Sequence, residues 1–293
     1  MDSITSVVVR GADIYGVAAV TTDMVQKART IHATSPTVTA AFGRLLTGAA
    51  LLGTVLKEPS HRIILQVHGR GPVQKLMAES DGLGRVRGYP GVATADMPSR
   101  HGKLDVGGVV GQGMLHVIKE VGNPEPTTGT VPLENGEIAE DLAAYLLQSE
   151  QIPSAVALGV FVRHDYVVTA AGGFLVQFHA EIDDELIAHI EQALAHTPAV
   201  TAMVQAGYQP QDMLQRALGD LPLDVVRHGT PQWSCYCSRE RVIQALIAMG
   251  RQELYDLIVK EGSTEIRCEF CTTVYTFQKE ELEALLAEAM RDD

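Results

Sequence analysis

Four cysteines are the residues of this 293-residue sequence whose type and spacing most directly indicate chemistry. They form two close pairs, Cys235 with Cys237 and Cys268 with Cys271, and 30 residues separate the two pairs. Two close pairs on a longer spacer can bring four sulfurs into one tetrahedron, as in structural zinc sites. The sequence therefore predicts one zinc ion per chain, held by all four thiolates.

The spacing of the first pair also indicates redox chemistry. Cys235 and Cys237 stand two positions apart, so a disulfide between them would close a small, strained ring, and strained disulfides are the labile, regulatory kind. Thiolates are also the species that peroxide or hypochlorous acid attacks, and their oxidation would eject the zinc. The alternative interpretation is a permanent zinc module without switching, which is the commoner role of a four-cysteine site.

The segment that must position these cysteines is short. In residues 232–293 we expect a helical hairpin between the two pairs, strands at 265–268 and 273–277 around the second pair, and a helix from Gln278 onward. About sixty residues make a small core, and a structural zinc can contribute ~10 to 16 kcal/mol to its folding. Loss of the metal is therefore expected to unfold the segment.

The first 178 residues contain no cysteine and mix strand-like with helix-like patterns. Runs rich in Val, Ile and Phe predict strands. Ser35 followed by Pro36 predicts the start of a helix that continues to Lys57, and the spacing of apolar residues predicts a second helix over 136–151. We predict an α+β core domain over residues 1–178, with mainly antiparallel sheets.

Residues 179–231 differ from both neighbours. Their pattern predicts three short helices, at 183–196, 197–206 and 210–218, the second of which would begin at the pair Thr197-Pro198. Helices of about ten residues are marginal in water unless they pack against something. The segment is therefore either a switchable helical linker between the core domain and a C-terminal zinc domain of residues 232–293, or a permanently docked helical subdomain.

The charge of the chain limits its partners. The formal net charge is −13, and eleven of these negative charges lie beyond residue 178, where acidic side chains outnumber basic ones by twenty to nine. An acidic chain is not expected to bind nucleic acid or an anionic membrane. Residues 45–56 are too short an apolar run to span a bilayer, and we interpret them as a buried helix. The N-terminal residues do not resemble a signal peptide, so we expect a cytoplasmic protein.

The quoted residues lead to a resemblance that covers the whole chain. The sequence closely resembles the heat shock protein 33 family, the bacterial redox-regulated chaperones. Its most specific match is the run of Cys235-Tyr-Cys237-Ser-Arg-Glu-Arg241 together with Cys268-Glu-Phe-Cys271. Further matching runs are TAAFGRLLTGAALLG at 39–53, GRGPVQKLMAESDGLGRVRGY at 69–89, AAYLLQSEQIPSAVALGV at 143–160 and AGGFLVQF at 171–178.

The resemblance implies a non-enzymatic, ATP-independent holdase that is inactive while reduced and zinc-bound. It further implies that oxidation joins Cys235 to Cys237 and Cys268 to Cys271, releases zinc, and unfolds the zinc domain and then the linker. The oxidised homodimer would bind unfolding client proteins. Candidate client-binding residues form the apolar stripe of the linker, although each also fits helix packing in the resting state: Leu186, Ile187, Ile190, Leu194, Val200, Met203, Val204, Met213 and Leu214.

Two other classes of function compete with the chaperone. An adaptor would use the zinc module to bind protein or nucleic acid regardless of redox state, but the acidic charge of the module disfavours nucleic acid. A thiol-disulfide enzyme would carry its Cys-x-x-Cys at the start of a helix in a βαβ unit, whereas the pattern here places it after a short strand. No Gly-x-Ser-x-Gly or Gly-x-x-x-x-Gly-Lys motif is present, so no hydrolase or nucleotide-binding signature is found.

Overall fold

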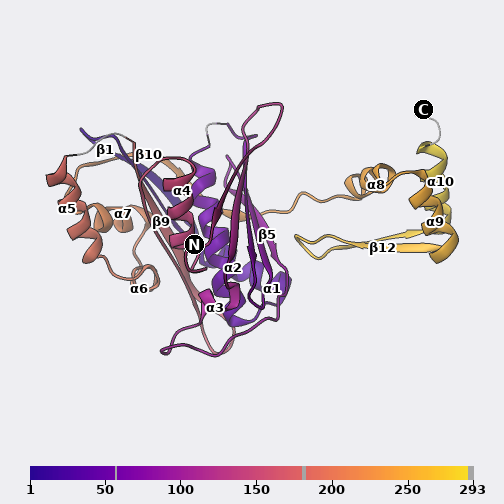
Figure 1. Cartoon of the computed structure of the whole chain (residues 1–293), viewed down its shortest axis with the longest axis horizontal. Helices are drawn as coiled ribbons and strands as arrows, with labels where there is room; N and C mark the ends of the chain where they lie inside the picture. Colours follow the sequence, from indigo (N-terminus) through magenta and orange to yellow (C-terminus); the bar gives the residue numbers. More distant parts are fainter. Residues whose placement is uncertain (57, 180–182, 290–293) are drawn as a thin grey trace. The chain divides into compact units, whose positions relative to one another are not determined.

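The computed structural model describes residues 1–56, 58–179 and 183–289 of the chain (Figure 1). It divides into two compact units, Met1–Ser234 and Cys235–Asp293. Both units combine helices with antiparallel strands, so the predicted α+β class is confirmed. All four cysteines belong to the second unit, which begins at the first of them. The further division at residue 178 stays a prediction.

The first unit is built on two sheets. The five-stranded sheet is antiparallel throughout and has the order β10-β1-β2-β9-β8. Its strands are β1 (Ser3–Val9), β2 (Ile14–Val20), β8 (Ser154–Val162), β9 (Val168–Phe178) and β10 (Leu223–Gly229).

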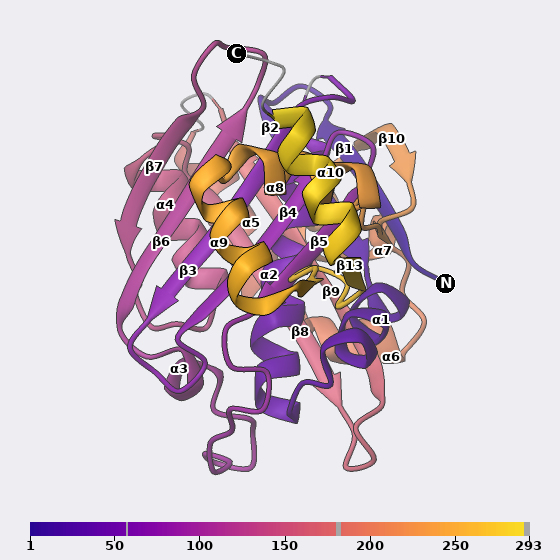
Figure 2. The same ribbon diagram turned by 90° about the vertical axis from the view of Figure 1, so that its right-hand side faces the viewer.

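The second sheet has six strands in the order β11-β5-β4-β3-β6-β7, and only the short pair of β11 with β5 is parallel. Figure 2 shows β7, β6, β3, β4 and β5 side by side. The strands are β3 (Arg62–Gly69), β4 (Lys75–Asp81), β5 (Arg85–Pro90), β6 (Gly113–Glu120), β7 (Thr127–Pro132) and β11 (Gln232–Trp233).

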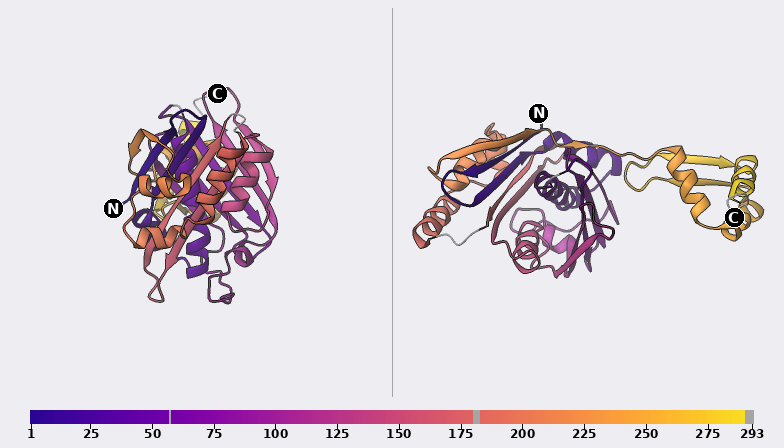
Figure 3. Two further views of the ribbon diagram at one scale, coloured as in Figure 1. Left: turned by 90° about the vertical axis from the view of Figure 1, so that its left-hand side faces the viewer. Right: turned by 90° about the horizontal axis from the view of Figure 1, so that it is seen from above.

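Helix α2 (Pro36–Thr54) lies between the two sheets and fills the main core (Figure 3). It begins as predicted, because the Ser35 side chain accepts a hydrogen bond from the backbone N–H of Val38 and Pro36 occupies the first turn. A helix that is apolar around most of its circumference must be buried on all sides, and nearly all of α2 is. The predicted end at Lys57 lies outside the described residues. Among those described, no helix is long and apolar enough to cross a membrane.

Three smaller helices complete this part of the unit. They are α1 (Thr22–His32), α3 (Val106–Val110) and α4 (Ala139–Gln148). Helix α4 is the one predicted over 136–151, but it starts later, because the backbone at Ile138 has a φ of +73°. The carboxylate of Asp141 accepts hydrogen bonds from the backbone N–H groups of Glu134 and Ile138, and so fixes the preceding loop against the helix start.

Glu150, just beyond α4, ties this helix to β6. Its carboxylate lies 2.6 Å from Lys119 Nζ and accepts a hydrogen bond from the hydroxyl of Tyr145. Burial acts to raise the pKa of Glu150, but the hydrogen bonds from Lys119 and Tyr145 outweigh it and hold this pKa below its usual value. The ionised form of Glu150 is therefore favoured in the folded state.

We expect Glu150→Gln to lower the free energy of unfolding of the first unit by about 1 kcal/mol at pH 7. Because the folded pKa of Glu150 lies below its unfolded value, this stabilisation is present above the unfolded pKa and is lost as the pH falls through the folded pKa. Urea unfolding followed by the fluorescence of the single, buried Trp233 measures it at pH 7 and pH 3. Glu125→Gln, at an exposed loop position, is the control; an equal loss at both pH values would contradict the prediction.

From residue 183 to residue 231 the structure describes three short helices and one strand. The helices are α5 (Asp184–Ala195), α6 (Val200–Gln205) and α7 (Pro210–Leu218), and the strand is β10. The prediction that a helix begins at Thr197-Pro198 is wrong. The hydroxyl of Thr197 instead donates to the backbone oxygen of Ala193 in the last turn of α5, and α6 starts at Val200 after Ala199. Strand β10 was not predicted.

The three helices pack on the outer face of the five-stranded sheet (Figure 3). Helix α7 packs closely on this face: a Cβ added at Gly16 of β2 would lie 3.1 Å from a methyl group of Leu214. Five residues of the apolar stripe are buried and three are partly buried, while Ile187 remains exposed. In this structure the stripe therefore serves helix packing. The buried residues are Ile190, Val200, Met203, Met213 and Leu214.

The second unit has the elements that the sequence predicted. A helical hairpin, α8 (Arg239–Ala248) and α9 (Arg251–Glu261), separates the two cysteine pairs, and the antiparallel hairpin of β12 (Ser263–Arg267) and β13 (Val274–Gln278) is followed by α10 (Lys279–Ala289). Its buried core is small. The buried hydrophobic residues in the described part of the unit are Leu246, Leu254, Ile258, Phe277, Leu282 and Leu285.

Candidate metal centre

The four cysteine sulfurs lie together in the second unit, all within 4.8 Å of one another. Cys235 Sγ is 3.8 Å from Cys268 Sγ, and Cys237 Sγ is 3.3 Å from Cys271 Sγ. Four ligands at 2.3 Å from a tetrahedral zinc would be about 3.8 Å apart. The cluster thus has the donor type, number and spacing of a four-coordinate metal site, and it could hold a metal ion.

Two chain segments supply the sulfurs. Cys235 and Cys237 lie in the extended stretch that leads into α8, where the Ser238 side chain accepts a hydrogen bond from the backbone N–H of Arg241 and caps the helix. Cys268 and Cys271 lie in the turn between β12 and β13. This turn is closed by the backbone N–H of Cys268, which donates to the oxygen of Thr273. The helix start and the turn thereby fix all four Cβ atoms.

Two hydroxyl groups contact the sulfurs. The hydroxyl of Tyr275 donates a hydrogen bond of 3.1 Å to Cys237 Sγ, and Thr273 Oγ1 is 3.2 Å from Cys271 Sγ. Both come from the strand side of the turn. Sequence reasoning did not identify them, although Thr273 and Tyr275 follow Cys271 at alternate positions of a strand, a spacing that can place both on the same side as the sulfurs.

The thiols differ in how readily they ionise. Burial raises the pKa of Cys235 to about 12 and also raises the pKa of Cys268. Burial opposes the ionisation of Cys271 as well, but hydrogen bonds from the side chain and backbone of Thr273 lower its pKa to about 7. Four sulfurs this close together do not all ionise without a compensating positive charge. A divalent cation is the group that would make every one of them a thiolate.

The sulfurs are half-buried, and none is enclosed in the core. Small oxidants can therefore reach them. Within the described residues, no histidine or carboxylate belongs to the cluster. His228, the histidine nearest to the cysteines in sequence, belongs to β10 of the first unit, where its Nδ1 is 3.0 Å from Thr5 Oγ1. The predicted set of four cysteines is thus the set that the fold brings together.

Trp233 lies at the end of the first unit, two positions before Cys235. It is buried in the main core, edge-on to the rings of His32 and Phe42, at centroid distances of 5.8 and 6.4 Å. Its contacts are with the core of the first unit, so its fluorescence reports on that core.

Comparison with known proteins places these features in a family context. The family model described as Hsp33 protein matches residues 2–278. The 33 kDa chaperonin of Geobacter sulfurreducens is 44% identical over 285 residues, which cover 97% of this chain and 94% of the relative. That of Thermus thermophilus is 42% identical and covers 97% and 86%. The crystal structure of the Thermotoga maritima 33 kDa chaperonin superimposes with a TM-score of 0.90 at 37% identity and covers 99% of both chains.

Proposed function

The chain belongs to the Hsp33 family of chaperones, and we propose that it is a redox-regulated, ATP-independent holdase, inactive while reduced and metal-bound. The convergence of four half-buried cysteine sulfurs within 4.8 Å, in a unit with little core of its own, carries this proposal. A site of this kind can be both a structural staple and an oxidant sensor. We propose that the chain is not an enzyme and that it binds neither nucleic acid nor membranes. We also propose that it is located in the cytoplasm.

The metal that suits the site is zinc, one ion per chain, held by Cys235, Cys237, Cys268 and Cys271. Soft thiolates in a tetrahedral arrangement favour zinc, and four protein ligands leave no open position for a substrate. The hydroxyl of Tyr275 would support the Cys237 thiolate from outside the ligand set, as second-shell groups commonly do. Bound zinc supplies structure here, by holding two chain segments that otherwise meet around six buried hydrophobic side chains.

The proposed switch is the oxidation of the four cysteines in two pairs, Cys235 with Cys237 and Cys268 with Cys271. Each pair of thiolates loses two electrons and forms one S–S bond, while one molecule of hydrogen peroxide takes up these two electrons and two protons from solvent and becomes two molecules of water. Sulfurs joined in disulfides are no longer thiolate ligands, so the metal leaves. The sulfur distances place crossed pairs within reach too, but once the unit loosens, cysteines close in sequence remain the nearest neighbours.

The unfolding caused by loss of the metal would extend to the linker. The second unit would unfold, since about sixty residues without a staple are marginal. Residues 179–231 would then lose order, because their helices have only 6 to 12 residues each and depend on packing against the five-stranded sheet. Release of these helices would expose the apolar stripe and the sheet face beneath it. Unfolding client proteins would bind there, and we propose that the active form is a homodimer.

One experiment tests the function directly. The reduced chain is expected to hold about one zinc ion, to release it with peroxide as four thiols become two disulfides, and only then to suppress the aggregation of a chemically unfolded client. Zinc release, thiol titration and light scattering measure the three steps. Oxidised protein that leaves aggregation unchanged would contradict the chaperone. Turnover of a disulfide substrate would favour the enzyme, and binding that ignores redox state would favour the adaptor.

A further inference from the structure

Strand β8 forms a free edge of the five-stranded sheet. In the described part of the chain it pairs with β9 alone. Its nine residues, SAVALGVFV, include no charged residue and no proline. Proteins usually protect long sheet edges with lysine, proline or a bulge, because an unpaired edge invites another strand. A bulge lies only at the far end of β8, between Phe161 and Val162, so the first part of the strand is a regular edge.

The hydrogen bonds of β9 determine which backbone groups are free. The N–H of Phe178 donates to the oxygen of Pro153, and the N–H of Thr21 donates to the oxygen of Ala171 on the opposite side of β9. Antiparallel pairing alternates from residue to residue, so the N–H and C=O groups of Val156 and Leu158 point away from β9. They offer a ladder of two donors and two acceptors to an added strand.

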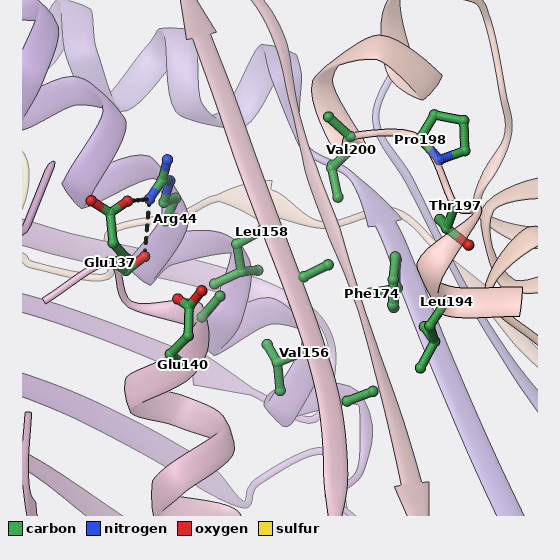
Figure 4. A pocket seen from close by; sticks show the side chains of 14 residues that line it. Arg44, Glu137, Glu140, Val156, Leu158, Phe174, Leu194, Thr197, Pro198 and Val200 are labelled. Atoms are coloured by element: carbon green, nitrogen blue, oxygen red, sulfur yellow. Dashed lines mark hydrogen bonds and ion pairs between the residues drawn. The ribbon is translucent and has the colours of Figure 1, made fainter. Parts of the chain in front are cut away.

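Two adjoining cavities, of about 510 and 960 Å³, follow this edge and share Ala155 and Leu194 as lining residues. Consecutive residues 154–158 line them, which places the cavities along the edge of β8. We call them together the β8 groove. One wall is α4, with Ala144 and Leu147, and the other is formed by α5 and the start of α6. Figure 4 shows Val156 and Leu158 on the side of Glu140, with Phe174, Leu194 and Val200 on the other side.

The charges of the β8 groove select its occupant. Arg44 is already committed to Glu137, to whose backbone oxygen and carboxylate its guanidinium donates. Glu140 and Glu191 add two further carboxylates to the lining, so the groove is net negative between apolar walls. A second copy of the chain fits poorly, because its own β8 is flanked by the same two helical walls. An extended single strand with apolar and basic side chains has the matching shape and charge.

We propose that the β8 groove binds an extended, apolar segment of an unfolded polypeptide, with a basic residue beside it, as an added sixth strand of the sheet. This inference rests on the proposed chaperone function and gives it a specific capture site. Backbone pairing makes such a site tolerant of sequence, since the hydrogen bonds are the same for any client. The groove is complete in the reduced chain, where α5 and the start of α6 form one of its walls. There it would hold one short extended segment, whereas holding a whole unfolding protein would also need the surface that release of the linker exposes.

The test uses the reduced, full-length chain and a fluorescein-labelled octapeptide of alternating valine and threonine with lysine at each end. Fluorescence anisotropy is expected to show binding. Methylation of the backbone nitrogens of alternate residues removes the donors on one edge of the peptide, and methylation on the edge that faces β8 is expected to weaken binding at least tenfold. Ala144→Trp, which fills the groove from α4, is expected to weaken it similarly. Gln148→Trp, on the same helix but not in the lining, is the matched control and should bind as wild type does.

Three outcomes overturn the inference: equal affinity of both methylated peptides and the parent, unchanged affinity in Ala144→Trp, or no binding at all. If the peptide fails to bind and sedimentation shows a dimer that Ala144→Trp dissociates, the edge belongs to a second copy. Aggregation assays with the oxidised wild type are run in parallel. Suppression of aggregation without peptide binding would refute the groove alone, whereas absence of both would refute the proposed function as well.

Discussion

The double substitution Cys268→Ser with Cys271→Ser is expected to abolish metal binding and to unfold the second unit under fully reducing conditions. A structural zinc contributes ~10 to 16 kcal/mol, whereas whole domains are stable by only ~5 to 15 kcal/mol. The second unit buries few hydrophobic side chains, and two remaining thiolates cannot complete a tetrahedron. We therefore expect the zinc content to fall from about one ion per chain to near zero.

Limited proteolysis measures the structural consequence. Trypsin is expected to cleave the reduced variant within residues 235–293 and to leave the wild type protected there. Glu269→Ser is the matched control, because it changes an exposed residue in the same turn and keeps all four sulfurs. Unchanged protection in the double variant would show that the unit folds without its metal. That result would remove the energetic basis of the proposed switch.

The cysteine cluster could be predicted from sequence because its geometry is local. Each pair is held by a few neighbouring residues: Ser238 caps the helix after the first pair, and the backbone of Thr273 closes the turn around the second. Spacing alone therefore indicated which sulfurs meet. The contact of Tyr275 with Cys237 joins segments 38 residues apart, and the alternate spacing of Thr273 and Tyr275 after Cys271 does not identify Cys237 as the partner.

Long-range sheet pairing explains most of what the sequence did not reveal. Strand β10 follows the helical segment, and its partner β1 begins at residue 3, so more than 200 residues separate the paired strands. The free edge of β8 depends likewise on where β9 places it in the sheet. The strand propensity of a segment does not reveal whether the strand lies at the edge of a sheet. The β8 groove also needs α4 and α5, which flank β8 in space and lie on either side of it in the chain.

The proposed mechanism requires that detachment of the linker helices from the five-stranded sheet is by itself sufficient for client binding. In the proposed switch, oxidation changes the second unit and the linker together, so an oxidation experiment cannot separate their effects. A substitution that releases the linker while the metal site stays intact can do so. Leu214 is the suitable position, because it is fully buried in α7 and its methyl group packs directly over Gly16 of the five-stranded sheet.

Leu214→Asp is expected to make the reduced, zinc-loaded chain suppress client aggregation without oxidant. Placing an unpaired carboxylate in this apolar contact removes the packing of Leu214 and adds a desolvation cost, together about 3 to 5 kcal/mol, which short helices cannot absorb. Protease should then cleave within residues 184–218, while bound zinc and the Trp233 fluorescence stay as in the wild type. Gln211→Asp adds the same charge at an exposed position of α7 and should remain inactive until oxidised. If Leu214→Asp frees the linker but the reduced protein stays inactive, linker release is not the activating step, and capture would require the unfolding of the zinc unit itself.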